Sequence, residues 1–221
     1  MAGKLFESRA ARLRDATAIA VLRMGAADHA IEAAGTAVRG GFEAVEITLN
    51  TPDATDALSE IAGRVDALLG VGTVLAAEEV KQAYDSGAEF IVTPVVLPEV
   101  IEAGHDLQLP VLMGASTPTE LLTARRAGAD WVKVFPAESL GGPDYISHVL
   151  GPLNDLPILV TGGITPENYL GYLDAGAELV GFGASVFDVD LAAEGRYDEI
   201  ERRCVEVHRR LDLYFTDTGS E

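Results

Sequence analysis

Cysteine, lysine and long apolar runs are scarce in this chain of 221 residues. Its one cysteine, Cys204, excludes an internal disulfide framework and a cysteine-based metal cluster. No apolar run approaches the ~20 residues that a membrane-spanning helix needs. The N-terminal stretch "MAGKLFESRAARLRDA" lacks the apolar core of a secretory signal. We therefore expect a soluble, cytoplasmic protein with no membrane partner.

Two further absences narrow the chemistry. The four histidines are isolated, and no H-x-H or H-x-x-x-H pair occurs. The stretch "GVGTVL" lacks the third glycine and the following acidic residue of a dinucleotide-binding fingerprint. The sequence thus predicts a protein that uses neither a metal nor a cofactor.

Basic residues are outnumbered, with 16 against 35 acidic ones and a formal net charge of −19. Such a charge repels nucleic acid and anionic membranes, so neither is an expected partner. Lysine is rare, at Lys4, Lys81 and Lys133 only. The acidic excess indicates the solvated shell of a salt-adapted cytoplasmic protein, or else an ordinary acidic bacterial protein.

Short apolar, β-prone runs alternate with helical patterns along the whole chain. The eight runs are 18–24, 44–50, 67–74, 90–95, 110–115, 131–136, 157–163 and 178–185. Continuous apolar strands separated by helices predict a parallel sheet that is covered by helices. Eight such units predict a single (β/α)8 TIM barrel over 1–221, with an N-terminal helix near 5–14 and a long C-terminal helix near 195–214. A doubly wound open sheet is the alternative.

A repeated pattern predicts which strand residues face inward. Four motifs place a glycine at a helix end before an even-numbered strand, at Gly41, Gly87, Gly128 and Gly176. The fifth residues after these glycines are Glu46, Val92, Lys133 and Gly181. Alternate strands of such a barrel supply one interior layer. Glu46 and Lys133 are therefore predicted to face the same cavity, with Gly181 leaving room between them.

Lys133 stands in the apolar stretch "VKVFPAESLGG". Burial favours the neutral amine, which is the form that attacks a ketone to give a Schiff base. A carboxylate close by, here Glu46, suits the proton transfers that follow. The alternatives are a lysine that extends to solvent and a purely structural Lys133–Glu46 ion pair.

Glycines near the C-terminus indicate an anion site. Thr161, Gly162 and Gly163 lie in "VTGGITPENY", and Gly183 and Ser185 lie in "GFGAS". Both stretches end a predicted strand, and backbone amides of these two loops bind phosphate in many barrel enzymes.

Several stretches together resemble one family, the class I aldolases that cleave 2-keto-3-deoxy-6-phosphogluconate (KDPG) and its galactonate epimer. They include "GGFEAVEITLNT", "GVGTVL", "GAEFIVTP", "ADWVKVFPAESLGG" and "ILVTGGITPENY", in family order from about residue 40 to 187. The resemblance implies that Lys133 forms the Schiff base and that Glu46 is the general acid/base. It further implies homotrimers and a phosphorylated keto-acid as the small-molecule substrate.

Substrate-binding roles also follow from the resemblance. Thr73 matches the threonine that holds the pyruvate carboxylate, and Pro94 and Phe135 match residues that line the pyruvyl pocket. Gly162, Gly163 and Ser185 match the residues that bind the substrate phosphate.

The resemblance places Asn50 among the substrate-binding residues, although the gluconate-type pattern E-V-T-L-R-T has an arginine at this position. The galactonate-type enzymes resemble this chain there, and they carry an arginine at the position of Arg23. Arg23 ends the first predicted strand, where it either binds the substrate carboxylate or is a surface charge. The preferred C4 epimer is left open.

The sequence therefore predicts an aldolase that cleaves KDPG to pyruvate and glyceraldehyde 3-phosphate. The galactonate epimer, or both epimers, is the nearest alternative substrate. A phosphosugar isomerase or epimerase that uses Glu46 as a base without a covalent step is a second alternative, and a non-catalytic sugar-phosphate binding protein is a third.

Overall fold

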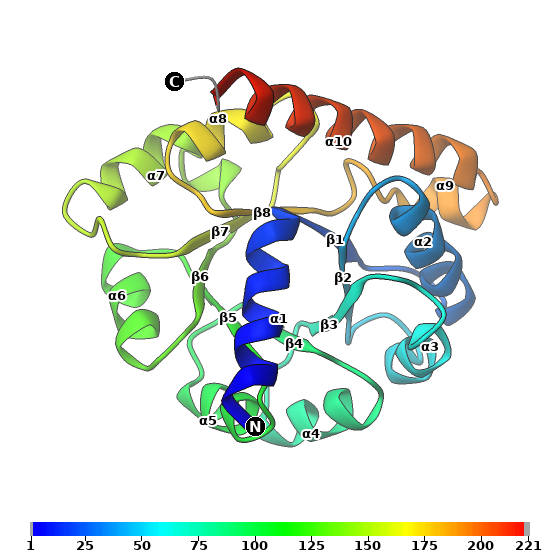
Figure 1. The fold of residues 1–221 in the computed structure, drawn as a ribbon, viewed down its shortest axis with the longest axis horizontal. Helices are drawn as coiled ribbons and strands as arrows, with labels where there is room; N and C mark the ends of the chain where they lie inside the picture. The colour runs from blue at the N-terminus through cyan, green and yellow to red at the C-terminus, as the bar shows by residue number, and fades with distance from the viewer. Residues whose placement is uncertain (1, 219–221) are drawn as a thin grey trace.

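The computed structural model, which describes residues 2–218, is a closed barrel of eight parallel strands (Figure 1). The strands are β1 (Ala18–Leu22), β2 (Ala44–Thr48), β3 (Leu68–Gly72), β4 (Phe90–Thr93), β5 (Val111–Ala115), β6 (Trp131–Val134), β7 (Ile158–Thr161) and β8 (Leu179–Phe182). They pair in chain order, and β8 pairs with β1 to close the sheet. This closure confirms the predicted (β/α)8 barrel and excludes the open sheet.

Helices surround the barrel on its outer face (Figure 1). They are α2 (Ala27–Arg39), α3 (Ala54–Ile61), α4 (Ala77–Asp85), α5 (Pro98–Asp106), α6 (Pro118–Arg126), α7 (Gly142–Leu150), α8 (Tyr169–Asp174), α9 (Val189–Ala193) and α10 (Tyr197–Thr218), with a short 3-10 helix η1 (Glu138–Leu140) after β6. Local signals set some starts: Thr117 caps α6 and exchanges hydrogen bonds with Glu120, and Pro118 occupies the first turn. No helix within residues 2–218 combines the length and apolarity of a membrane span.

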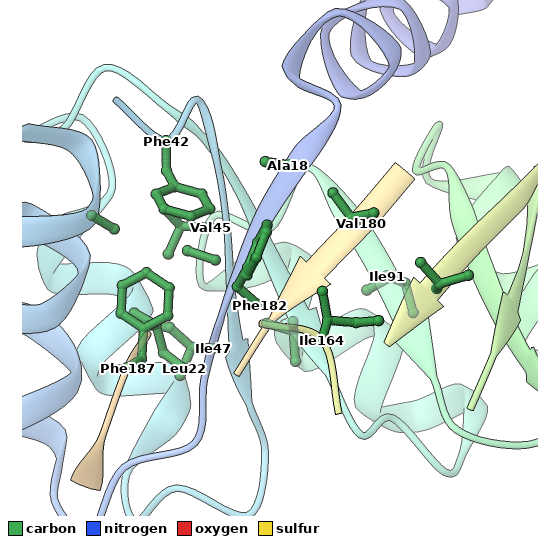
Figure 2. Close-up of a cluster of buried hydrophobic side chains, with 14 of the residues drawn as sticks. Ala18, Leu22, Phe42, Val45, Ile47, Ile91, Ile164, Val180, Phe182 and Phe187 are labelled. Atoms are coloured by element: carbon green, nitrogen blue, oxygen red, sulfur yellow. The ribbon is translucent and has the colours of Figure 1, made fainter. Parts of the chain in front are cut away.

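The hydrophobic core has two layers. The outer one lies between the strands and the helices, where Phe42 makes edge-to-face contacts with Phe182 and Phe187 at ring-centroid distances of 6.0 and 5.4 Å (Figure 2). The inner one fills the barrel with side chains such as Phe90, Leu112 and Trp131. These layers fix the strands from both sides, which is what positions the side chains at their ends.

Helix α1 (Ala2–Ala16) crosses one end of the barrel (Figure 1). Its Leu13 and Ala16 belong to the inner cluster, together with Ile19, Ala44 and Leu68, which lie at the first or second position of β1, β2 and β3. The helix therefore closes the end at which the strands begin, and the opposite end remains for ligands.

The four glycines that set the predicted register all have positive φ angles: 106° at Gly41, 101° at Gly87, 104° at Gly128 and 103° at Gly176. Only glycine adopts this conformation without steric cost. Each one ends a helix and starts the next strand in the same way, so equivalent positions on the even strands share one orientation.

Candidate active site

A cavity of about 430 Å³ opens at the end where the strands finish. Every predicted site residue except Asn50 lines it: Arg23, Glu46, Thr73, Pro94, Lys133, Phe135, Thr161, Gly162, Gly163, Gly183 and Ser185. The folded chain thus brings together residues that are up to 162 positions apart in the sequence, from Arg23 to Ser185.

Asn50, which the resemblance placed among the substrate-binding residues, is not among the residues that line the cavity. It is exposed in a turn after β2, which the Thr51 amide closes by donating to the Thr48 carbonyl at 2.9 Å. The Thr51 hydroxyl in turn accepts a hydrogen bond from the Met24 amide at 3.0 Å. Because Thr51 is held against the barrel by that bond, the preceding residue projects to solvent.

Lys133 and Glu46 line the cavity from β6 and β2, in agreement with the register prediction. Both are buried, with 7% and 1% of their surface exposed. Burial lowers the pKa of Lys133, which the nearby Glu46 charge counteracts and Arg23 reinforces. Burial also raises the pKa of Glu46, against the opposing influence of Lys133 and Arg23. Each group is shifted toward its neutral form.

The Glu46 carboxyl forms no ion pair with any residue that the structure describes. Neither of its oxygens has a hydrogen-bond partner among residues 2–218, although both are buried. A buried carboxyl that serves only stability is normally satisfied by donors. The geometry therefore leaves both oxygens available to a bound molecule.

Room for the Glu46 side chain comes from Gly72, which the sequence analysis did not single out. A Cβ atom on Gly72, the last residue of β3, would overlap the Glu46 carboxyl. A glycine inside a strand often marks such a close approach, and "GVGTV" carried that signal. Gly181 lines the cavity together with Glu46 and Lys133, as the register predicted. A Cβ there would lie 2.6 Å from Thr161 Cγ2 and 3.3 Å from Val21 Cγ2, on the neighbouring strands β7 and β1.

Two threonines add hydroxyl groups to the cavity. Thr161 Oγ1 is buried and has no partner among the described residues. Thr48 Oγ1, which donates to the Leu22 carbonyl at 3.3 Å, was missed by the sequence analysis. It stands two residues after Glu46 on β2, so strand alternation places it on the same inward face. The Phe135 ring lies 5.5 Å from Lys133 Nζ and forms part of the apolar wall.

The two glycine-containing loops are joined at the mouth of the cavity. Ser185 Oγ, after β8, donates to the Ile164 carbonyl, after β7, at 2.6 Å. Within residues 2–218, the amides of Gly163, Ile164, Ala184 and Ser185 donate no hydrogen bond to the protein. These residues line the cavity, so free N–H groups from two loops meet at one place, as an anion site requires.

The cavity combines a buried amine with an unpartnered carboxyl and free amides, and comparison with known families decides among the chemistries these groups allow. The sequence matches the family described as "KDPG and KHG aldolase" over residues 10–203. The chain belongs to this aldolase family. It is therefore a carbon–carbon lyase with the TIM-barrel fold that the family resemblance predicted.

Relatives of the aldolase include enzymes named for both epimers. The chain is 37% identical over 198 residues to the 2-dehydro-3-deoxy-phosphogluconate aldolase of Haemophilus influenzae, covering 89% of this chain and 93% of that one. It is 36% identical over 179 residues to the 2-dehydro-3-deoxy-6-phosphogalactonate aldolase of Escherichia coli, covering 80% and 87%. A KDPG aldolase from Legionella pneumophila, crystallised with pyruvate as a covalent carbinolamine intermediate, has a TM-score of 0.82 at 27% identity over 90% of this chain and 97% of that one.

Proposed function

We propose that the aldolase cleaves KDPG to pyruvate and glyceraldehyde 3-phosphate through a Schiff base on Lys133, with Glu46 as the general acid/base. The observation that carries this proposal is the buried Lys133 amine facing the unpartnered Glu46 carboxyl in one cavity. The depressed pKa of Lys133 supports it, because only the neutral amine is nucleophilic.

The proposed reaction starts with attack of the Lys133 amine on the C2 ketone to form a carbinolamine. Glu46 donates a proton to the departing hydroxyl, and water leaves to give a cationic imine. The Glu46 carboxylate then accepts the C4 hydroxyl proton while the C3–C4 bond breaks. The electron pair of the C3–C4 bond moves into the imine, which becomes the enamine of pyruvate, and the aldehyde is released. Protonation at C3 and hydrolysis free pyruvate and restore the amine.

Substrate binding is assigned to the remaining cavity residues. Arg23 forms no hydrogen bond or ion pair with any residue that the structure describes, so its guanidinium is available for the substrate carboxylate together with Thr73. Thr161, with its unpartnered hydroxyl, serves the same end of the substrate. The phosphate is bound by Gly162, Gly163, Gly183 and Ser185 at the mouth.

Cleavage of the galactonate epimer is the second candidate. Two observations favour it: Asn50 replaces the arginine of the gluconate-type pattern, and Arg23, which the galactonate-type resemblance implies, lines the cavity. Side-by-side kcat/KM values on the two purified epimers decide the preference. A ratio within about tenfold, or 1.4 kcal/mol in transition-state binding, indicates a dual-specificity enzyme.

The proposal also includes a homotrimer that works in the cytoplasm. Leu75 and Val95 are 52% and 46% exposed in the loops that follow β3 and β4, where a neighbouring copy would cover them. A phosphorylated substrate does not cross a bilayer unaided, which favours an enzyme on the side where the substrate is made. Sedimentation equilibrium measures the assembly directly.

Borohydride reduction in the presence of pyruvate tests the covalent step. The expected result is an irreversible pyruvyl adduct that peptide mapping places on Lys133, with Lys4 and Lys81 as internal controls in the same digest. Lys133→Met is expected to abolish both the adduct and the aldol cleavage. Activity that survives this substitution supports the isomerase or epimerase alternative. A folded protein that binds KDPG without turnover supports the binding-protein alternative.

A further inference from the structure

A carboxylate outside the cavity lies against the loop that follows β7. Glu138 of η1 accepts hydrogen bonds at Oε2 from the Tyr172 hydroxyl at 2.7 Å and from Asn168 Nδ2 at 3.3 Å. Tyr172 is fully buried in α8, and Asn168 stands just before that helix. None of the three lines the cavity, so the proposed reaction assigns them no part.

Asn168 also holds the loop of residues 162–165 directly. Its Nδ2 donates to the Gly163 carbonyl at 2.9 Å, and its Oδ1 accepts from the Thr165 amide at 2.8 Å. Glu138 contributes through its backbone as well, because its amide donates to the Gly162 carbonyl at 3.0 Å. Two consecutive carbonyls of the loop are thus fixed on the side of Glu138 and Asn168.

The geometry of the peptide unit means that these carbonyl contacts also determine where the following amides point. In a trans peptide the N–H points opposite to the C=O of the same unit. Fixing the Gly162 and Gly163 carbonyls therefore turns the amides of Gly163 and Ile164 away from Glu138 and Asn168. Gly163 and Ile164 line the cavity, and their amides have no acceptor within residues 2–218.

We propose that Glu138 is a positioning residue which, through Asn168, aims the Gly163 and Ile164 amides at the phosphate of the substrate. The inference rests on the proposed function, since it assigns the anion at this loop to the substrate phosphate. Glu138 itself never touches that phosphate. Burial, reinforced by the hydrogen bond to Glu138, raises the pKa of Tyr172, so its hydroxyl stays protonated and remains a donor.

Calorimetric titration with glycerol 3-phosphate, a phosphate ester that cannot react, measures the anion site without turnover. Glu138→Ala is expected to raise its Kd roughly tenfold, the effect of losing a charge-assisted hydrogen bond that orders the loop. Glu138→Gln keeps an acceptor oxygen and removes a negative charge, so it is expected to bind at least as tightly as the unmodified aldolase. Glu167→Ala is the matched control, because Glu167 lies between that loop and Asn168 and its side chain has no hydrogen bond or ion pair with a described residue.

Deuterium exchange into the methyl group of pyruvate supplies a readout that needs Lys133 but no phosphate. The exchange rate of Glu138→Ala is expected to stay within about twofold of Glu167→Ala, while its KM for KDPG rises and its kcat is retained. A Kd in Glu138→Ala equal to that of Glu167→Ala overturns the proposal, and so does an equal loss of exchange and phosphate binding in a folded variant. If the unmodified enzyme exchanges no deuterium, the proposed aldolase mechanism is contradicted. The glycerol 3-phosphate titration still tests whether Glu138 positions the loop.

Discussion

Glu46 and Lys133 are held in surroundings that oppose their charges, so their chemistry has a cost in folding stability. The unfolded chain ionises Glu46 near its ordinary pKa of 4.5, whereas burial raises that pKa in the folded protein. Above pH 4.5 the unfolded state is therefore favoured by this group, and below it the penalty disappears. Lysine at 133 adds a penalty of the opposite pH dependence, since its lowered pKa opposes folding until the pH rises past its ordinary value of 10.5.

Glu46→Gln tests this trade between activity and stability. We expect kcat to fall by roughly 10²–10⁴ through loss of proton transfer. We also expect the Tm at pH 8 to rise above that of the unmodified enzyme, by about 2–4 °C for each kcal/mol that the substitution adds to the free energy of unfolding. Calorimetric scans from pH 4 to pH 8 measure the difference, which should shrink as the pH falls. A variant that is less stable at pH 8 contradicts the argument that the carboxyl is unsatisfied.

Gly72 decides whether the Glu46 side chain fits. Gly72→Ala puts a methyl group where the carboxyl lies, and misplacing a catalytic group by about 1 Å costs roughly 10² in kcat. Gly25→Ala is the matched control, because a Cβ there meets nothing within 4 Å and the residue does not line the cavity. Steady-state kinetics on KDPG compares the two variants. Equal kcat values would show that Glu46 tolerates displacement.

At the scale of elements, the strands and the inward register could be predicted from the sequence because both depend on local signals. Apolar runs mark the strands, and the glycines that end the preceding helices determine which strand residues face inward. Asn50 could not be placed, because its direction depends on a hydrogen bond between Thr51 and Met24, which are far apart in the chain. The contacts of Glu138 with Asn168 and Tyr172 could not be predicted either, because they also join residues that are far apart in the chain.

Helix α1 is an element whose role is structural closure. Arg14 lies over the Trp131 ring at 5.2 Å, and Leu13 is fully buried in the inner cluster. Leu13→Ala is expected to lower the free energy of unfolding by about 2–5 kcal/mol with kcat on KDPG retained. Leu213→Ala, at a position 51% exposed on α10, is the control and should change stability by less than about 0.5 kcal/mol. Urea titrations followed by circular dichroism measure both. A Leu13→Ala loss no larger than the control's would mean that α1 does not close the barrel.

At the scale of the whole molecule, the net charge of −19 acts against compactness, and the ion pairs that the structure contains are mostly exposed and weak. Screening at molar salt reduces this repulsion. If the shell is salt-adapted, the Tm and the aldol cleavage rate should both rise between 0.1 and 2 M KCl. Equimolar NaCl serves as the control for a specific potassium effect. A Tm and rate that are highest at low salt would identify an ordinary acidic protein.

The closure of one barrel end by α1 also bears on the kinetic order of the proposed reaction. Leu13, Ala16 and Trp131 fill that end, and the cavity lies at the end where the strands finish. Lys133 follows Trp131 by two residues on β6, so the proposed reaction attaches the pyruvyl group at the inner end and places the phosphate at the mouth. The aldehyde must then leave first and pyruvate second, and in the synthetic direction pyruvate must bind before the aldehyde. Product-inhibition patterns of an ordered mechanism are the steady-state result expected from this order of release.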